Sequence, residues 1–324
     1  MSYNSLINIC FSSHRAESIP FAKKLMEDHD IIILEEATNP GFNDMLNKKI
    51  SIDAYVREEE TEFPEFSRRH YKVLRKLYKK GKKVLQVEPY TEQLMNIHSL
   101  FSEGKEPSDI MKISGLRHVY EAERKATAAL LSFYESSIRD PFQRVVDAVK
   151  GFAKSDAERF RLRDTMRAEA ISKILVDENK VYIEAGGIHV YLKKILNKIL
   201  GKGSRIKTTF LLEPVIRKLT GEKEILSPGD LLTIHYILNK TKNDDYETLL
   251  ASRSLIYIKL LVKEEMLPSR NEKTPHIKDE IMANELVKGL NAAQCEELFK
   301  KIRFQNRQKT LGTLHRYLRG NSFL

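Results

Sequence analysis

The chain has 324 residues, of which 41% are hydrophobic and 31% are charged, and it carries a net charge of +10 at pH 7. This composition supplies enough apolar side chains for a core, and it excludes a fully disordered chain, a collagen and a disulfide scaffold. Because no run of 18 consecutive apolar residues occurs in the sequence, it predicts no membrane-spanning helix.

The start of the chain and its cysteines indicate the expected compartment. The segment Met1–Cys10 has neither a basic leader nor a long apolar run, so we expect no secretion signal. Cys10 and Cys295 lie far apart, and Cys10 falls in an apolar run, which favours a small buried side chain over a disulfide or a metal ligand. We therefore expect a cytoplasmic protein.

The first two hundred residues alternate between strand-like and helix-like segments. Short apolar runs typical of buried strands cover residues 6–11, 31–34, 84–87 and 181–185. Helical patterns cover residues 18–26, 66–80, 190–200 and a long stretch from 115 to 175, with breaks expected near Asp140-Pro141 and Gly151. This alternation predicts an α/β fold: a mostly parallel sheet with flanking helices and a long helical insertion.

The sequence Gly201-Lys202-Gly203-Ser204 is the expected boundary between two domains, residues 1–204 and 205–324. Beyond it, residues 205–212 fit either one more edge strand or an extended connection. Ser227-Pro228-Gly229-Asp230 has the residues of a helix start, with Ser as the N-cap and Pro in the first turn. The pattern then predicts a mainly helical C-terminal region.

The end of the chain is basic. No acidic residue follows Leu298. The basic residues of this segment are Lys300, Lys301, Arg303, Arg307, Lys309, Arg316 and Arg319. Two interpretations stay open: a solvated helix face that closes the fold, or a surface in 298–324 that docks an acidic partner or nucleic acid.

Polar residues follow three of the predicted strands. Phe11-Ser12-Ser13-His14 follows the first, Glu35-Glu36 the second, and Gly186-Gly187-Ile188-His189 the last. Since the carboxyl ends of parallel strands share one edge of a sheet, we expect His14, Glu35 and His189 to converge. Two imidazoles and a carboxylate can hold a divalent metal ion, or they can form a base with its orienting group. Taken singly, each residue also fits an ordinary turn or cap.

Arg163 lies on the apolar face of a predicted helix that a capping box at Ser155–Glu158 is expected to start. Arg167 falls on the same face. A guanidinium on the core side needs an anionic partner, because an unpaired buried charge costs several kcal/mol. Arg163 therefore fits either a structural bridge to a carboxylate or a fixed positive charge that faces the site.

The order of these elements resembles the TraB/PrgY–GumN–TIKI superfamily, which has erythromycin-esterase-like and ChaN-like relatives. That family has a G-x-x-H after the first strand, a Glu after the second, an R-[ND]-x-x-M helix and a second G-x-x-H. His14, Glu35, Arg163-Asp164-Thr165-Met166 and Gly186-Gly187-Ile188-His189 match these motifs in order, across residues 6–200. The first motif departs from the family, since Phe11 stands where the family has Gly.

The resemblance implies a hydrolase of peptides or small esters, with His14, Glu35, Arg163 and His189 as the catalytic residues. It implies further that His14, Glu35 and His189 bind a divalent ion, either Zn, Mn or Co, which lowers the pKa of a bound water. A metal-free version has His14 as the base, oriented by Glu35. The alternative is a non-catalytic binding or regulatory protein with a degenerate site, which would act through its basic C-terminus.

Overall fold

The computed structural model describes residues 6–175, 179–201 and 205–321, and these form two compact units. The first, here called the sheet unit, comprises residues 1–121, 160–224 and 265–275. The second, the helical unit, comprises residues 122–159, 225–264 and 276–324. Residues 202–204 of the expected boundary lie outside the described residues, and the division after residue 204 stays a prediction.

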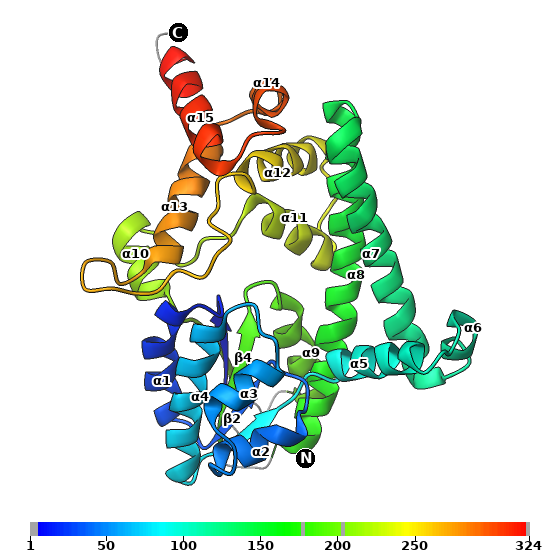
Figure 1. Ribbon diagram of the computed structural model, residues 1–324, viewed down its shortest axis with the longest axis vertical. Helices are drawn as coiled ribbons and strands as arrows, with labels where there is room; N and C mark the ends of the chain where they lie inside the picture. The colour runs from blue at the N-terminus through cyan, green and yellow to red at the C-terminus, as the bar shows by residue number, and fades with distance from the viewer. Residues whose placement is uncertain (1–5, 176–178, 202–204, 322–324) are drawn as a thin grey trace. The chain divides into compact units, whose positions relative to one another are not determined.

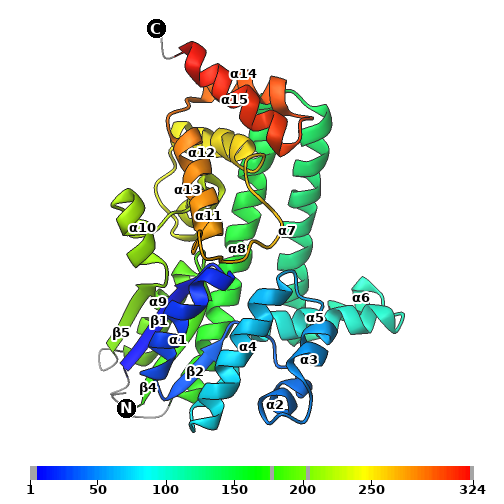
Figure 2. The ribbon, with the colours of Figure 1, turned by 60° about the vertical axis from the view of Figure 1, so that its left-hand side comes forward.

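The sheet unit contains five parallel strands in the order β3-β2-β4-β1-β5 (Figures 1 and 2). The strands are β1 (Leu6–Ser12), β2 (Ile31–Leu34), β3 (Lys83–Gln86), β4 (Lys180–Gly186) and β5 (Arg205–Phe210). The predicted α/β fold with a parallel sheet is confirmed. Of the two alternatives for residues 205–212, the edge strand is correct, because β5 pairs with β1.

Helices cover both faces of this sheet (Figure 1). Those that lie wholly in the sheet unit are α1 (Ile19–Glu27), α2 (Pro40–Leu46), α3 (Ile52–Glu58), α4 (Pro64–Lys79), α5 (Pro89–Ser102), α6 (Pro107–Ile110), α9 (Val190–Leu200) and α10 (Glu213–Thr220), with a short 3₁₀ turn at Ala16–Ser18. Alternate residues of each strand point to opposite faces. Ile32 packs with α1 to α4, whereas Ile33 packs with α9 and the end of α8. Burial on both faces explains the uninterrupted apolar runs of the strands.

Two long helices, α7 (Ser114–Arg139) and α8 (Phe142–Ile174), occupy the predicted helical insertion. They are separated at Asp140-Pro141, as expected. The predictions of a break at Gly151 and of a helix start at Ser155 are wrong, since α8 runs through both positions. Residues before Ser155 are already helical, and burial of Val149 and Ala153 outweighs the roughly 1 kcal/mol that an internal glycine costs.

The helical unit confirms the predicted helical C-terminal region. Its later helices are α11 (Pro228–Ile237), α12 (Asp244–Tyr257), α13 (Pro275–Lys288), α14 (Ala292–Ile302) and α15 (Arg307–Asn321). Ser227 caps α11, with its Oγ accepting a hydrogen bond from the backbone N–H of Asp230 at 3.0 Å, as its sequence predicts. Val146, Leu255 and Leu298 belong to one buried cluster that joins these helices to α8.

Two further expectations concern the cysteines and membrane-spanning helices. Cys10 and Cys295 are both buried free thiols, which confirms the expected role of Cys10 as a small apolar side chain. None of the helices in the described ranges combines the length and the apolar character needed to cross a membrane. Residues 1–5 of the segment in which no leader is expected lie outside the described residues.

Candidate active site

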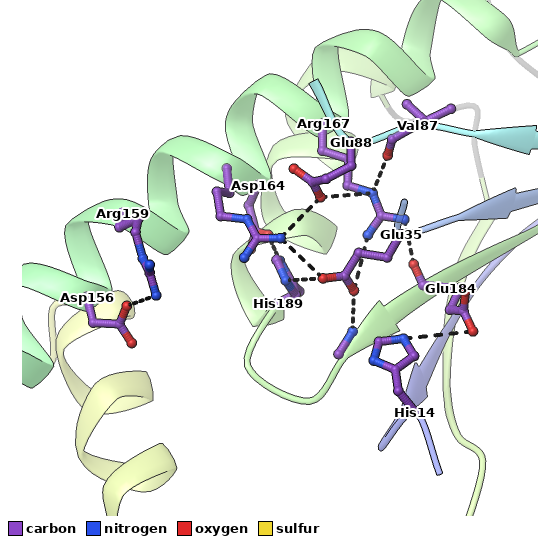
Figure 3. A network of polar contacts seen from close by, with 12 residues as sticks. His14, Glu35, Val87, Glu88, Asp156, Arg159, Asp164, Arg167, Glu184 and His189 are labelled. Atoms are coloured by element: carbon purple, nitrogen blue, oxygen red, sulfur yellow. Dashed lines mark hydrogen bonds and ion pairs between the residues drawn. The ribbon is translucent and has the colours of Figure 1, made fainter. Parts of the chain in front are cut away.

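The residues predicted at the strand ends lie together at the carboxyl edge of the sheet (Figure 3). Gly186, the last residue of β4, is the common neighbour. A methyl group on its Cα would lie 3.6 Å from Cδ2 of His189, 3.7 Å from Oε2 of Glu35 and 4.0 Å from Cε1 of His14. The imidazole rings of His14 and His189 are therefore well within roughly 10 Å of each other, close enough to belong to one site. Strand β4 brings them together because it lies between β1 and β2.

His189 is held between two carboxylates. Its Nε2 lies 2.7 Å from Oε1 of Glu35, and its Nδ1 contacts Oδ1 of Asp164. Burial by itself would lower the pKa of His189, but the negative charges of and hydrogen bonds to Glu35 and Asp164 raise it to about 9. At neutral pH the ring is therefore an imidazolium that donates from both nitrogens.

Glu35 is the centre of this array. Its Oε2 accepts a hydrogen bond from the backbone N–H of Gly186 at 2.6 Å. Burial favours the neutral acid, but the charge and hydrogen bond of His189, together with the charge of Arg167, hold the pKa of Glu35 well below its usual range. Glu35 is therefore a carboxylate at neutral pH, although its side chain is only 10% exposed.

Two arginines of α8 complete the array. Nη2 of Arg163 lies 3.5 Å from Oε1 of Glu35 and 3.5 Å from Oε2 of Glu88. Arg167, which is fully buried, donates to the carbonyl of Val87 at 2.9 Å and to that of Glu184 at 2.7 Å. Both guanidiniums on the apolar face of the helix thus have anionic or carbonyl partners, as the sequence argument requires.

His14 differs from His189 in its exposure. Its side chain is 36% exposed, and its Nε2 lies 3.8 Å from Oε1 of the buried Glu184. The backbone of His14 has a φ of +50°, a left-handed conformation that side chains other than glycine adopt at an energetic cost. This turn carries the imidazole out of the strand and leaves it partly exposed.

A second histidine, His70 of α4, lies near the same carboxylate oxygen. Its Nε2 is 3.9 Å from Oε1 of Glu184 and has no hydrogen-bond partner among the described residues. Burial lowers the pKa of His70, so it is neutral at physiological pH. The sequence showed no partner for His70, and its role here depends on the packing of α4.

The predicted metal ligands do not fit a metal ion in this arrangement. Both ring nitrogens of His189 are occupied by carboxylates. Glu35 is already paired with His189 and lies close to Arg163 and Arg167. Across the residues that the structure describes, no three His, Cys, Asp or Glu side chains are grouped so that they could hold an ion.

Sequence reasoning did not assign Asp164, Arg167, Glu88 or Glu184 to the site. Signals for three of them were present: Asp164 follows Arg163 in the matched motif, and Arg167 lies on the apolar helix face. Glu184 is a lone acid within an apolar strand. A charged residue in such a position needs a partner, so a search for unpaired charges in predicted core segments would have found it.

Comparison with known proteins finds a relative of this chain in an archaeon. An "Uncharacterized protein" from Archaeoglobus fulgidus is 32% identical over 296 residues, which cover 91% of this chain and 98% of the relative. No family model and no solved structure matches the chain. The chain belongs to the same family as this archaeal protein.

Proposed function

We propose that the chain hydrolyses peptide or ester bonds, with His14 as the general base. The observation that carries this proposal is the accessible imidazole of His14 at the edge of an array whose other histidine is fixed between two carboxylates. A base must reach a water and a substrate, and of these two side chains only His14 is exposed enough to do so.

In the proposed reaction, Nδ1 of His14 takes a proton from a water molecule while Nε2 faces Glu184, and the oxygen of that water forms a bond to the carbonyl carbon. The carboxylate of Glu184, 3.8 Å away, stabilises the resulting imidazolium. The imidazolium then gives its proton to the leaving alcohol or amine as the bond to the carbonyl carbon breaks. Glu184 thereby takes the orienting role that the sequence analysis gave to Glu35.

Arg163 is the group proposed to offset the charge on the carbonyl oxygen. Its side chain is 19% exposed, whereas Arg167 behind it is completely buried. A preorganised positive charge stabilises the tetrahedral oxyanion more than the neutral carbonyl, which lowers the barrier. Glu35 and His189 are positioning residues in this scheme, because they hold the Gly186 backbone and the guanidinium of Arg163.

The other candidate function, docking through the basic end of the chain, has less support. Lys300, Lys301 and Arg307 pair with Glu296, Glu297 and Asp279 respectively. Arg303 donates to the carbonyls of Ser136 and Ser137. These contacts favour the interpretation in which the segment closes the helical unit.

The resemblance to the TraB superfamily stays a prediction.

The test is a hydrolysis assay with 4-nitrophenyl esters and short peptides on His14→Asn. Asparagine tolerates the left-handed backbone of this turn, so the fold should be retained. We expect kcat/KM to fall by about 100-fold or more, as for loss of a general base. His98→Ala, at an exposed position of α5, is the control and should keep full activity. Undiminished hydrolysis by His14→Asn, or none by the wild type, contradicts the proposal.

A further inference from the structure

Arg15, the residue after His14, has its guanidinium fixed in place. Its Cζ lies 3.7 Å from the centroid of the Phe63 ring, a cation–π contact. The backbone carbonyl of Arg15 accepts hydrogen bonds from the N–H of Ser18 at 2.9 Å and from the hydroxyl of Ser18 at 2.7 Å. Both ends of the residue are thus held, so the position of its charge is defined by the fold.

Among the residues that the structure describes, this guanidinium has no polar partner. Its Nη1 is shielded from solvent and makes no hydrogen bond, and Arg15 forms no ion pair with any carboxylate in the described part of the chain. Arg163 and Arg167, by contrast, lie next to Glu35 and Glu88. A shielded donor without a partner is destabilising, and more so when it is charged. An unpaired cation next to the candidate base is typical of a group that awaits an anionic ligand.

The aromatic platform under Arg15 is held rigidly. The N–H of Phe63 donates to Oγ1 of Thr61 at 3.1 Å. The carboxylate of Glu265 then accepts hydrogen bonds from the N–H groups of Glu65 and Phe66, at 3.0 and 2.7 Å, at the start of α4. The ring of Phe66 in turn contacts that of His14, with the centroids 5.9 Å apart. Arg15 and His14 therefore pack against the same end of α4.

We propose that Arg15 binds a carboxylate group of the substrate and so places the scissile bond at His14. A guanidinium presents paired N–H groups that match the two oxygens of a carboxylate. The substrate class is then a peptide with a free carboxylate near the scissile bond, or the monoester of a dicarboxylic acid. This inference rests on the proposed hydrolase function and adds its specificity.

The test compares 4-nitrophenyl hemiglutarate, which is anionic, with 4-nitrophenyl butyrate, which is neutral. We expect Arg15→Ala to raise KM for the anionic ester roughly tenfold to a hundredfold, as for loss of a hydrogen bond to a charged group, with kcat little changed. The neutral ester should be unaffected, and Arg15→Lys should restore part of the loss. Arg57→Ala removes an exposed charge from α3 and is the matched control. Equal losses on both esters overturn the proposal.

A binding experiment separates this inference from the hydrolase function. Calorimetric titration of glutarate into His14→Asn measures the carboxylate site without any hydrolysis. If the double variant His14→Asn, Arg15→Ala no longer binds glutarate, the carboxylate site is supported. This holds even if the wild type hydrolyses neither ester and the hydrolase proposal fails. Glutarate binding that survives Arg15→Ala, or inorganic phosphate that binds more tightly than glutarate, overturns the assignment to a carboxylate.

Discussion

Oε1 of Glu35 lies 2.7 Å from Nε2 of His189, and this contact joins the end of β2 to the start of α9. Both side chains are at most 10% exposed. A buried pair of this kind adds little net stability over an apolar pair, but removal of one partner leaves an uncompensated charge. The pair therefore fixes the geometry of the site, and its loss should be measurable in both stability and titration.

Glu35→Gln should destabilise the protein by about 3–5 kcal/mol, because it leaves the charges of His189 and Arg167 without their shared carboxylate. It should also lower the pKa of His189. Urea unfolding and an NMR titration of the histidine would measure the two effects. Glu27→Gln is the matched control: its pairs with Lys23 and Lys80 are exposed, so it should cost less than about 1 kcal/mol.

Stability should fall at alkaline pH because of His189. Its pKa in the folded chain is about 9, above the roughly 6.5 of an unfolded histidine. The stabilisation is therefore fully present below about pH 6.5 and is lost as the pH rises through 9. Unfolding free energies from pH 6 to pH 10 should show this loss, and His189→Gln should flatten it. Identical pH profiles for the two proteins would count against the charged form of His189.

Folding raises the pKa of Glu36, whereas it lowers the pKa of Glu35. Burial, with the nearby carboxylates of Glu59 and Glu184, raises the pKa of Glu36 to about 8, against the opposing effect of its hydrogen bond from Gln86. Wild-type stability is therefore lost as the pH rises from about 4.5 through 8. Glu36→Gln should be more stable than the wild type at pH 8.5, by an amount on the order of a few kcal/mol, and equal to it near pH 4. Thermal unfolding of both proteins at pH 4 and at pH 8.5 would measure this difference in stability.

Gly186→Ala should lower activity while leaving the stability of the fold nearly unchanged. Its methyl group would meet His189, Glu35 and His14 at ordinary contact distances of 3.6 to 4.0 Å, so stability should change by less than about 1 kcal/mol. The same methyl fills the space between these side chains, and kcat/KM should fall at least roughly tenfold. Gly151→Ala, which meets nothing within 4 Å, should leave activity unchanged. A fully active Gly186→Ala would show that the substrate does not approach this edge.

Removal of metal ions should leave hydrolysis unchanged, since both ring nitrogens of His189 are paired with the carboxylates of Glu35 and Asp164. Dialysis against a chelator followed by elemental analysis and the ester assay would test this. Activity that disappears on chelation and returns with Zn, Mn or Co would restore the metal site that the family resemblance implies.

The sequence by itself was sufficient for the parallel α/β fold, because strands buried on both faces are continuous apolar runs such as Ile31–Leu34. It did not predict α2 and α3, which lie between the predicted strand at residues 31–34 and the predicted helix at residues 66–80. Nor did it predict the unbroken course of α8. Local start and stop signals compete there with the burial of distant apolar residues, and the sequence does not show which prevails.

For the site, the sequence identified His14, Glu35, Arg163 and His189. Polar residues at the ends of buried strands and on a core-facing helix can be recognised from the sequence pattern. The contacts that these residues make with one another were visible only in the tertiary structure. The same imidazoles and carboxylates suit a metal site or direct contacts with one another, and the difference lies in a few ångströms between side chains. Strand order places Gly186 between Glu35 and His14, and packing of α8 supplies Asp164 to His189. These distances depend on contacts between segments far apart in the chain, which no local pattern contains.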